Sequence, residues 1–345
     1  MKTKVLRNSF FLLAFLALLF ATPSLIRALN EGREVPVLMY HGFAEPAGDD
    51  VWTVSAKEFE RQMREMRADG RKAILPNQLA LAAKGFYLLP RKPVVITMDD
   101  GFLSNVTIAE PIMRKYGMKG ICYLILSHIE DTKEARSQHL GYDNLVWPEV
   151  REALSRGTLF FGSHSIRHQP FARRQSKELK RSRHVFHDKT GRKTNAYCYP
   201  NGHAPDLVWE RVQYKNRFTT AMICGDRVFR FSCVADLYRI PRVSVYGGKH
   251  AFSISFLGWH NGRLLASAAN AGLDMPVRLL LREKGTKRVF LSAGVPVRLG
   301  NGKSCEFHWD DLPTNLRKDA LEIIVAEQNG LFTYGEPIAV PVRNP

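Results

Sequence analysis

Short apolar runs alternate with amphipathic helical patterns between Val35 and about Gly248, and this alternation restricts the fold more than any other feature of the chain. The strand-like runs lie at residues 35–39, 94–98, 120–126, 159–162, 195–199, 218–222 and 239–245. The helical patterns lie at residues 56–69, 108–116, 147–156, 176–189 and 204–212. Strands that alternate with helices in this way form parallel sheets joined by crossover helices. The sequence therefore predicts an α/β domain over this part of the chain.

Acidic and imidazole side chains follow two of these runs directly. Asp99 and Asp100 follow the run 94–98, and His164 and His168 follow the run 159–162. Successive side chains of an extended chain point in opposite directions, so the adjacent acids can do different work. Two imidazoles four residues apart can converge on one ion. One carboxylate and two imidazoles leave coordination positions open, which favours a hydrolytic metal site over a structural one.

Four segments carry a resemblance to a known family: residues 97–101 (Thr-Met-Asp-Asp-Gly), 164–168 (His-Ser-Ile-Arg-His), 35–41 and 196–202 (Ala-Tyr-Cys-Tyr-Pro-Asn-Gly). They are similar, in the same order, to motifs of the polysaccharide deacetylases, the NodB-homology group also called carbohydrate esterase family four. The opening strand that ends in His41 resembles most the branch that acts on poly-N-acetylglucosamine exopolysaccharides.

The resemblance implies a distorted (β/α)7 barrel of NodB type over residues 31–249, and the count of strand-like runs agrees with it. After Gly248 the pattern changes to short strands separated by glycine-containing turns. We interpret residues 250–345 as a small all-β sandwich of immunoglobulin-like type. Its role is expected to be structural or adhesive, or to bind carbohydrate through Trp259, Trp309 or Phe332.

The first 30 residues predict a signal peptide or a membrane anchor. Lys2, Lys4 and Arg7 precede an uncharged run from residue 8 to 26. A positive start followed by an apolar core is typical of export signals. We therefore expect an exported protein that is periplasmic, extracellular or anchored to the envelope, and the pattern leaves open whether the segment is cleaved.

The family resemblance also implies roles for individual residues. Asp100, His164 and His168 would hold a divalent metal, with zinc as the first expectation and nickel, cobalt or iron as alternatives. Asp99 would be the general base that takes a proton from the attacking water. The backbone amide of Tyr199 would stabilise the oxyanion. Ser165 is expected to fix the histidine loop through hydrogen bonds to the backbone.

The chain departs from the family pattern at two points. Many members begin the third motif with an arginine that orients the base, whereas Asn195 and Ala196 stand here. The strand that bears the catalytic histidine in the family has no clear counterpart. His41 is the best substitute acid, or a substrate contact, although a structural histidine is an equal alternative. Arg242 could neutralise Asp99.

These observations predict a metal-dependent enzyme that hydrolyses N-acetyl groups of an exported polysaccharide, with poly-N-acetylglucosamine favoured. Peptidoglycan or chitin oligosaccharides are the alternative substrates, and a catalytically silent carbohydrate-binding or matrix protein is the alternative function. The net charge is +17, and cations cluster between residues 167 and 193. This cluster indicates a solvated helix or adhesion to anionic envelope polymers or a membrane surface. Nucleic acid is not expected, because the stretch has no interleaved aromatic platform and an exported protein rarely meets DNA.

The cysteines predict no zinc ribbon, because none of the five form a Cys-x-x-Cys pair. Cys224 and Cys233 flank a turn and could close a small disulfide loop in an oxidising compartment.

Overall fold

The computed structural model describes residues 22–47, 50–169, 176–204, 215, 217–225, 227–247, 252–260, 263–270, 275–283, 289–291, 297–299, 303–309, 321–327 and 333–340. The chain divides into two compact units: Met1–Ala44 with Ala56–Val245, and Glu45–Ser55 with Tyr246–Pro345. Residues 45–55, which the sequence places inside the first domain, thus group with the second unit, where the rings of Trp52 and Tyr246 lie 5.5 Å apart. The predicted helix 204–212 lies almost entirely outside the described residues.

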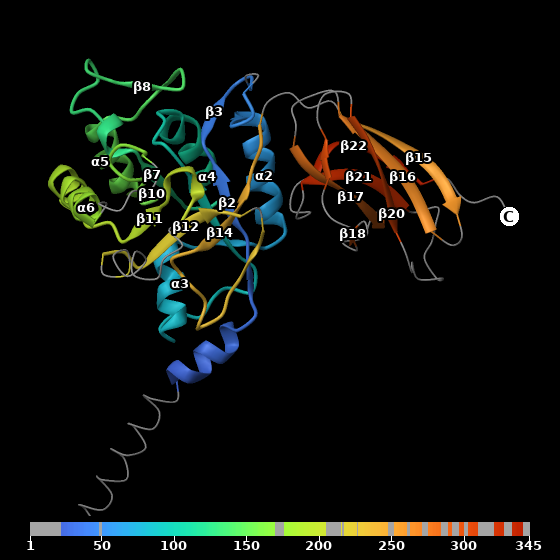
Figure 1. Ribbon diagram of the computed structural model, residues 1–345, viewed down its shortest axis with the longest axis horizontal. Helices are drawn as coiled ribbons and strands as arrows, with labels where there is room; N and C mark the ends of the chain where they lie inside the picture. The colour runs from blue at the N-terminus through green and yellow to red at the C-terminus, as the bar shows by residue number, and fades with distance from the viewer. Residues whose placement is uncertain are drawn as a thin grey trace, which may run out of the picture. The chain divides into compact units, whose positions relative to one another are not determined.

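Seven parallel strands close into a barrel in the first unit (Figure 1). In order around the barrel they are β2 (Val37–Tyr40), β14 (Ile240–Ser244), β12 (Thr220–Cys224), β11 (Ala196–Cys198), β10 (Leu159–Ser163), β7 (Gly120–Leu124) and β6 (Pro93–Met98), and β6 pairs with β2. The short strand β5 (Lys72–Ala73) adds to β6 outside the ring. The structure confirms the predicted distorted (β/α)7 barrel.

Helices cover the outside of this barrel. They are α2 (Ala56–Ala68), α3 (Pro76–Ala83), α4 (Glu110–Lys115) after the π-helical turn η1 (Asn105–Ala109), α5 (Trp147–Arg156) and α6 (Ser176–Thr190). A further helical segment, residues 22–30, precedes the short strand β1 (Glu34–Val35). In α5 the Glu149 side chain accepts a hydrogen bond from the Val146 amide, and the helix ends at Gly157 with a φ of 72°. These are the start and stop signals that make α5 predictable from the sequence.

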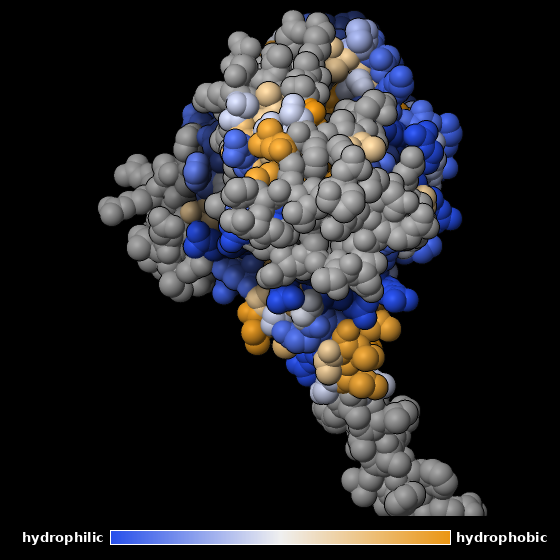
Figure 2. Space-filling model, turned by 90° about the vertical axis from the view of Figure 1, so that its right-hand side faces the viewer, coloured by the Kyte–Doolittle hydropathy of each residue, from blue (hydrophilic) through white to orange (hydrophobic). Residues whose placement is uncertain are grey.

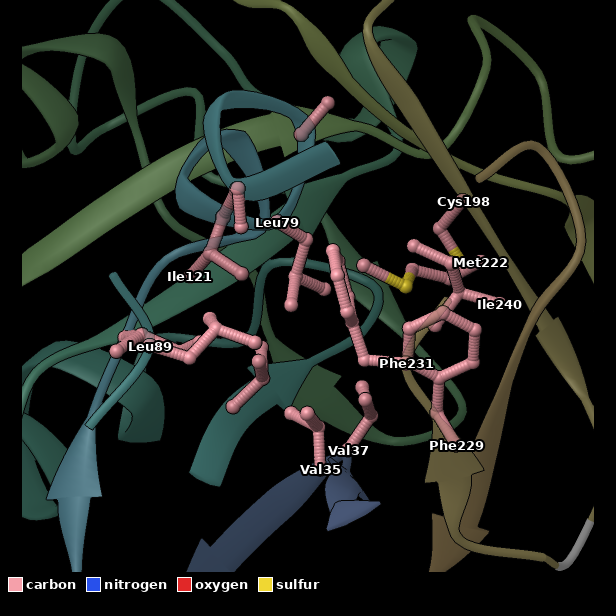
Figure 3. Packing of buried hydrophobic residues seen from close by; sticks show 14 of the residues in the cluster. Val35, Val37, Leu79, Leu89, Ile121, Cys198, Met222, Phe229, Phe231 and Ile240 are labelled. Atoms are coloured by element: carbon pink, nitrogen blue, oxygen red, sulfur yellow. The ribbon is translucent and has the colours of Figure 1, made fainter. Parts of the chain in front are cut away.

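Apolar side chains from the first halves of the strands fill the amino-terminal end of the barrel. Val37, Ile121 and Ile240 pack there with Leu79 of α3 and with Leu89 (Figure 3). Because apolar side chains occupy this end, the polar side chains at the carboxyl ends of the strands lie at the other end, where (β/α) barrels place their chemistry.

Two antiparallel sheets form the second unit. One contains β15 (Phe252–His260), β16 (Arg263–Asn270) and β20 (Lys303–Trp309); the other contains β17 (Met275–Glu283), β18 (Val289–Leu291), β19 (Val297–Leu299), β21 (Leu321–Glu327) and β22 (Thr333–Ala339). Alternate residues such as Leu264 and Ala266 of one sheet, and Leu279 and Leu281 of the other, share one core. This is the arrangement of a β-sandwich.

Several details of the two units differ from expectation. The sequence pattern predicts strands in the second unit at residues 253–257, 277–282, 288–291, 295–299, 304–309, 320–326 and 338–342. It predicts none at β16, and β22 begins five residues before the last predicted strand. Trp309 is 1% exposed within the core, so it offers no surface for carbohydrate. All five cysteines are free, so Cys224 and Cys233 form no disulfide. Among the described residues, no helix is long and apolar enough to cross a membrane.

Candidate metal centre and catalytic residues

The turn after β6 presents two buried carboxylates in one tight bend. Asp99 is 2% exposed and Asp100 is 5% exposed. The Asp99 amide donates to the Tyr40 carbonyl 3.0 Å away, which extends the β2–β6 pairing to this residue. Asp100 and Gly101 then adopt φ values of 71° and 86°. A left-handed conformation is uncommon for aspartate, and such residues concentrate at functional sites.

Asp100, His164 and His168 come together as the resemblance implied. Nε2 of His164 lies 3.7 Å from Oδ1 of Asp100 and 3.2 Å from Nε2 of His168. One ligand atom from each of the three residues lies within 4.8 Å of the others. Two nitrogens on one tetrahedral zinc ion stand about 3.3 Å apart, because each bond is about 2.0 Å long. The residues present therefore fit a divalent metal.

Hydrogen bonds orient the His164 imidazole and hold the loop that carries His168. Nδ1 of His164 lies 3.0 Å from the Cys198 carbonyl. A carbonyl can only accept, so Nδ1 carries the proton and Nε2 keeps its lone pair for the metal. The Ser165 hydroxyl accepts from the His168 amide at 2.9 Å, which confirms the predicted role of Ser165. Ser165 and His168 both have positive φ values, 71° and 52°, so the segment is a tight loop rather than a helical turn.

Asp99 is held by Arg242 rather than by the histidines. Nη1 and Nη2 of Arg242 donate to Oδ1 and Oδ2 of Asp99 at 2.7 and 2.8 Å. Arg242 lies on β14 and is 1% exposed. Its Nη1 also donates to the Thr97 hydroxyl, and its Nε to the Ile223 carbonyl. The structure thus confirms that Arg242 neutralises Asp99. It supplies from another strand the positive charge that is missing at Asn195 and Ala196.

This pairing separates the roles of the two carboxylates. Asp99, His164 and Cys198 form a second group with metal-ligand spacing. Both oxygens of Asp99, however, accept from Arg242. Burial also raises the pKa of the Cys198 thiol well above its ordinary value, so the thiolate that a metal requires is disfavoured. The set with Asp100 is therefore the better metal centre.

The ionisation of the site agrees with this assignment. Burial is the largest influence on Asp99 and would raise its pKa, but the charge and hydrogen bonds of Arg242, together with His164, more than offset burial and hold that pKa well below its ordinary value. Burial and the charge of Asp99 raise the pKa of Asp100 to about 7. Burial lowers the pKa of His164, and burial together with His164 lowers the pKa of His168 to about 4. At neutral pH both imidazoles are neutral and Asp99 is a carboxylate.

His41 lies at the same end of the barrel, directly after β2. Its charge contributes to the pKa shifts of both Asp99 and His164, so it stands within electrostatic reach of the site. The Asn105 side chain donates to the His41 carbonyl at 2.7 Å and fixes the backbone there.

The prediction for Tyr199 is wrong in one respect. Its amide donates to the Met222 carbonyl at 3.1 Å as part of the β11–β12 pairing, so it does not point at a substrate. The next residue, Pro200, has no N–H, and the Gly202 amide donates back to the Tyr199 carbonyl. Asn201, with a φ of 56°, is the remaining donor of this turn, and its amide has no backbone acceptor among the described residues.

A hairpin beside the metal centre has no signal in the sequence. Strands β8 (Gln138–His139) and β9 (Tyr142–Asp143) pair as an antiparallel hairpin. The His139 ring stacks on Phe102, 6.2 Å between centroids, and lies 6.4 Å from the His168 ring. Beside Phe102 is a cavity of about 310 Å³, which is lined by Leu103, Ser104, Thr107, Gln138, Gly141, Tyr142 and Asp143. Two-residue polar strands lack the apolar alternation by which strands are recognised.

Comparisons with known proteins agree with this geometry. Residues 88–217 match the family described as polysaccharide deacetylase. A Bacillus subtilis protein named for that activity, YxkH, is 26% identical over 173 residues, which cover 49% of this chain and 57% of YxkH. The poly-beta-1,6-N-acetyl-D-glucosamine N-deacetylase of Staphylococcus epidermidis is 24% identical over 207 residues, covering 56% of this chain and 68% of that protein.

Among solved structures, IcaB from Ammonifex degensii superposes with a TM-score of 0.54 and 21% identity, covering 62% of this chain and 93% of IcaB. At this identity the likeness concerns the fold alone. The family match covers residues 88–217, and the two curated relatives match 49% and 56% of this chain. The chain spans only 57% of the length of YxkH. The barrel of this chain therefore contains a polysaccharide deacetylase domain, which the family match places over residues 88–217.

Proposed function

We propose that this protein is an exported, metal-dependent N-deacetylase that removes acetyl groups from a polymer of N-acetylglucosamine. The observation that carries the proposal is that two adjacent carboxylates in one turn have pKa values shifted in opposite directions. Asp100 faces two neutral imidazoles, and Asp99, held ionised by Arg242, stands 3.8 Å from Nε2 of His164. This is the equipment that amide hydrolysis needs: a metal site with open positions and a carboxylate base next to it.

Asp100, His164 and His168 would hold the metal, with zinc expected first and nickel, cobalt or iron also suited to these ligands. A bound divalent cation polarises the amide carbonyl and acidifies water. Asp99 accepts the proton of the attacking water, because Arg242 keeps it deprotonated at neutral pH. The Asn201 amide is the backbone group available to donate to the developing oxyanion.

The leaving amine needs a proton, and His41 is the residue proposed to donate it. It closes β2 at the same barrel end as Asp99, and it is half-buried there. A histidine can donate and recover a proton near neutral pH, which suits an amine leaving group.

The proposed substrate is poly-N-acetylglucosamine, because a curated relative is named for that polymer and the His41-ended strand resembles the same branch. The cavity beside Phe102 would hold a neighbouring sugar of the chain. Its hydroxyl, amide and carboxylate groups can hydrogen-bond a sugar, and Tyr142 supplies an aromatic face.

Anionic envelope polymers are a second proposed partner. Part of the basic cluster lines a pocket of about 680 Å³ beside α6, formed by Lys180, Arg183, His184, His187, Asp188, Lys193 and Arg217. Among the described residues, no carboxylate pairs with Lys180, Arg183 or Lys193, so their charge is available to an anion.

The test is acetate release by the full-length protein, reloaded with zinc, from poly-N-acetylglucosamine, chitin oligomers and peptidoglycan. We expect release from poly-N-acetylglucosamine to be fastest, and chelation to stop it. Release from none of the three by a protein that retains its metal would contradict the proposal and favour a silent binding protein. A preference for peptidoglycan or chitin would overturn the substrate alone.

A further inference from the structure

We propose that the amino-terminal end of the barrel docks on an anionic lipid bilayer. The contact would be made by the basal apolar surface, which we define as the side chains of Leu25, Leu29, Leu81, Phe86 and Leu88. These five are among nine large hydrophobic side chains that are exposed in the described part of the chain. Their exposed fractions run from 40% for Leu81 to 68% for Phe86. Contiguous exposed apolar surface of this kind marks an interaction site.

Backbone and side-chain contacts join these residues into one surface. Asn30, which is fully buried, donates to the Tyr87 carbonyl at 2.8 Å and accepts from the Leu89 amide at 2.9 Å. These bonds lock the helical segment 22–30 along residues 85–90. At the other end of the segment, Pro23 approaches Gly85 so closely that a Cβ on Gly85 would lie 2.3 Å from the Pro23 carbonyl oxygen.

The apolar side chains then face outward from this contact. Leu25 and Leu29 are one helical turn apart and so lie on one face of the segment. The Phe86 amide donates to the Leu81 carbonyl, which holds Phe86 at the end of α3. Leu89 points into the barrel core, while its neighbour Leu88 is exposed (Figure 3). In Figure 2 hydrophobic surface gathers around the helical segment, in the lower part of the view.

Two features of the sequence identify the occupant as lipid. The uncharged run of residues 8–26 leads directly into the surface and contributes Leu25 to it. The exposed loop is Lys84-Gly85-Phe86-Tyr87-Leu88-Leu89-Pro90-Arg91, with apolar residues between two exposed cations. Aromatic and leucine side chains flanked by lysine and arginine are typical of segments that bind the interface of anionic membranes.

Docking in this way leaves the metal centre open to a polymer. The helical segment and residues 85–90 precede β2 and β6, so they lie at the amino ends of these strands. Asp99, Asp100 and His164 follow the carboxyl ends. A six-residue strand such as β6 spans roughly 20 Å, so the bilayer and the chemistry would lie at opposite ends of the barrel.

The test uses the full-length protein reconstituted in vesicles whose acyl chains carry bromine, which quenches tryptophan on contact. Phe86→Trp places a reporter on the basal apolar surface. Leu140→Trp is the matched control, because Leu140 is 71% exposed at the tip of the β8–β9 hairpin, near the catalytic end. The tryptophan emission that each variant has in excess of the wild-type protein should be quenched for Phe86→Trp and not for Leu140→Trp. Quenching should be stronger with phosphatidylglycerol than with phosphatidylcholine alone.

Vesicle-bound protein without quenching at position 86 would overturn the proposal, since the chain would then be held by its first residues with the barrel away from the lipid. Equal quenching at both positions would overturn the orientation. A different set of results would assign the surface to a second copy of the chain instead. The wild-type protein would sediment as a dimer, Phe86→Ser would be a monomer with an unchanged melting temperature, and Phe86→Trp would show no quenching in vesicles. None of these outcomes depends on acetate release, so failure here is distinguishable from failure of the proposed function.

Discussion

A buried arginine decides what each carboxylate of the site can do. Asp99 and Asp100 are neighbours in the chain, yet the first has its pKa lowered by Arg242 and the second has its pKa raised to about 7 by burial and by Asp99. Two like groups with separated pKa values are typical of acid–base sites. The contact joins residues 143 positions apart, so only closure of the barrel brings it about.

Arg242→Lys should lower the rate and move the acidic limb of its pH profile upward. Lysine keeps a positive charge but cannot donate to both oxygens of Asp99, so burial raises the Asp99 pKa and more acid remains protonated at a given pH. Metal content should not change. Arg242→Gln should in addition destabilise the fold by about 3–5 kcal/mol, the usual cost of leaving one partner of a buried pair uncompensated. An unmoved acidic limb in Arg242→Lys would exclude Arg242 as the group that holds Asp99 ionised.

Metal affinity should fall as the pH drops below about 7. In the metal-free protein Asp100 has a pKa of about 7, so at lower pH a proton must leave before the carboxylate can bind. The affinity should therefore decrease by about tenfold or more per pH unit between pH 7 and pH 5. Competition with a chelating dye at several pH values measures this slope. A flat affinity over this range would mean that Asp100 is ionised before the metal arrives.

At the scale of elements, three left-handed turns build the site. Asp100–Gly101, Ser165–His168 and Asn201–Gly202 each follow a barrel strand and contain residues with positive φ. In each turn the positive φ changes the direction of side chains or amides, which would otherwise alternate between the two faces of the strand.

Gly101→Ala should disturb the metal site as well as the fold. Gly101 has a φ of 86°, and its Cβ would lie 2.7 Å from Cδ2 of Leu124 and 3.2 Å from Cδ1 of Ile129. Gly117→Ala is the matched control, because Gly117 has a φ of 64° with nothing within 4 Å of the added Cβ. Both variants should lose about 1–2 kcal/mol of stability from the left-handed backbone. Only Gly101→Ala should also bind metal more weakly, as measured by the same dye competition. Equal metal affinity in the two variants would show that the turn tolerates a side chain.

Local sequence patterns explain which elements could be predicted. The barrel strands were found because continuous apolar runs end in polar residues, and α5 because it has Pro148, Glu149 and Gly157 at its limits. Helix α3 was not predicted, since it has eight residues and is largely apolar. Strand β16 is rich in alanine, which is a weak strand former. Of the site, the metal ligands and Asp99 follow from the motifs, whereas the engaged Tyr199 amide and the His139 hairpin depend on tertiary pairing that local patterns do not encode.

For the whole molecule, the barrel should hold the chemistry without the second unit. Every residue assigned to the reaction precedes Tyr246, so a chain ending after Gly247 should keep its activity on short oligomers. Residues 45–55 group with the second unit, where Val51 and Trp52 pack against its core. Truncation therefore exposes them, and the truncated chain should aggregate unless both are replaced by serine. Activity per metal ion, measured on the serine-substituted truncation, should match that of the full chain on oligomers. A large loss there would place part of the active site in the second unit.

The proposed mechanism requires Asp99 and Asp100 to have different roles, and one comparison of variants tests this directly. Metal content and acetate release are measured on the same zinc-reloaded preparations of the wild type, Asp99→Asn and Asp100→Asn. Asp99→Asn should keep one metal per chain and lose about 10²–10⁴-fold in rate, the usual scale for loss of a general base. Asp100→Asn should lose the metal and the activity together. If Asp99→Asn loses its metal, or keeps the wild-type rate, Asp99 is not the general base and the proposed mechanism is wrong.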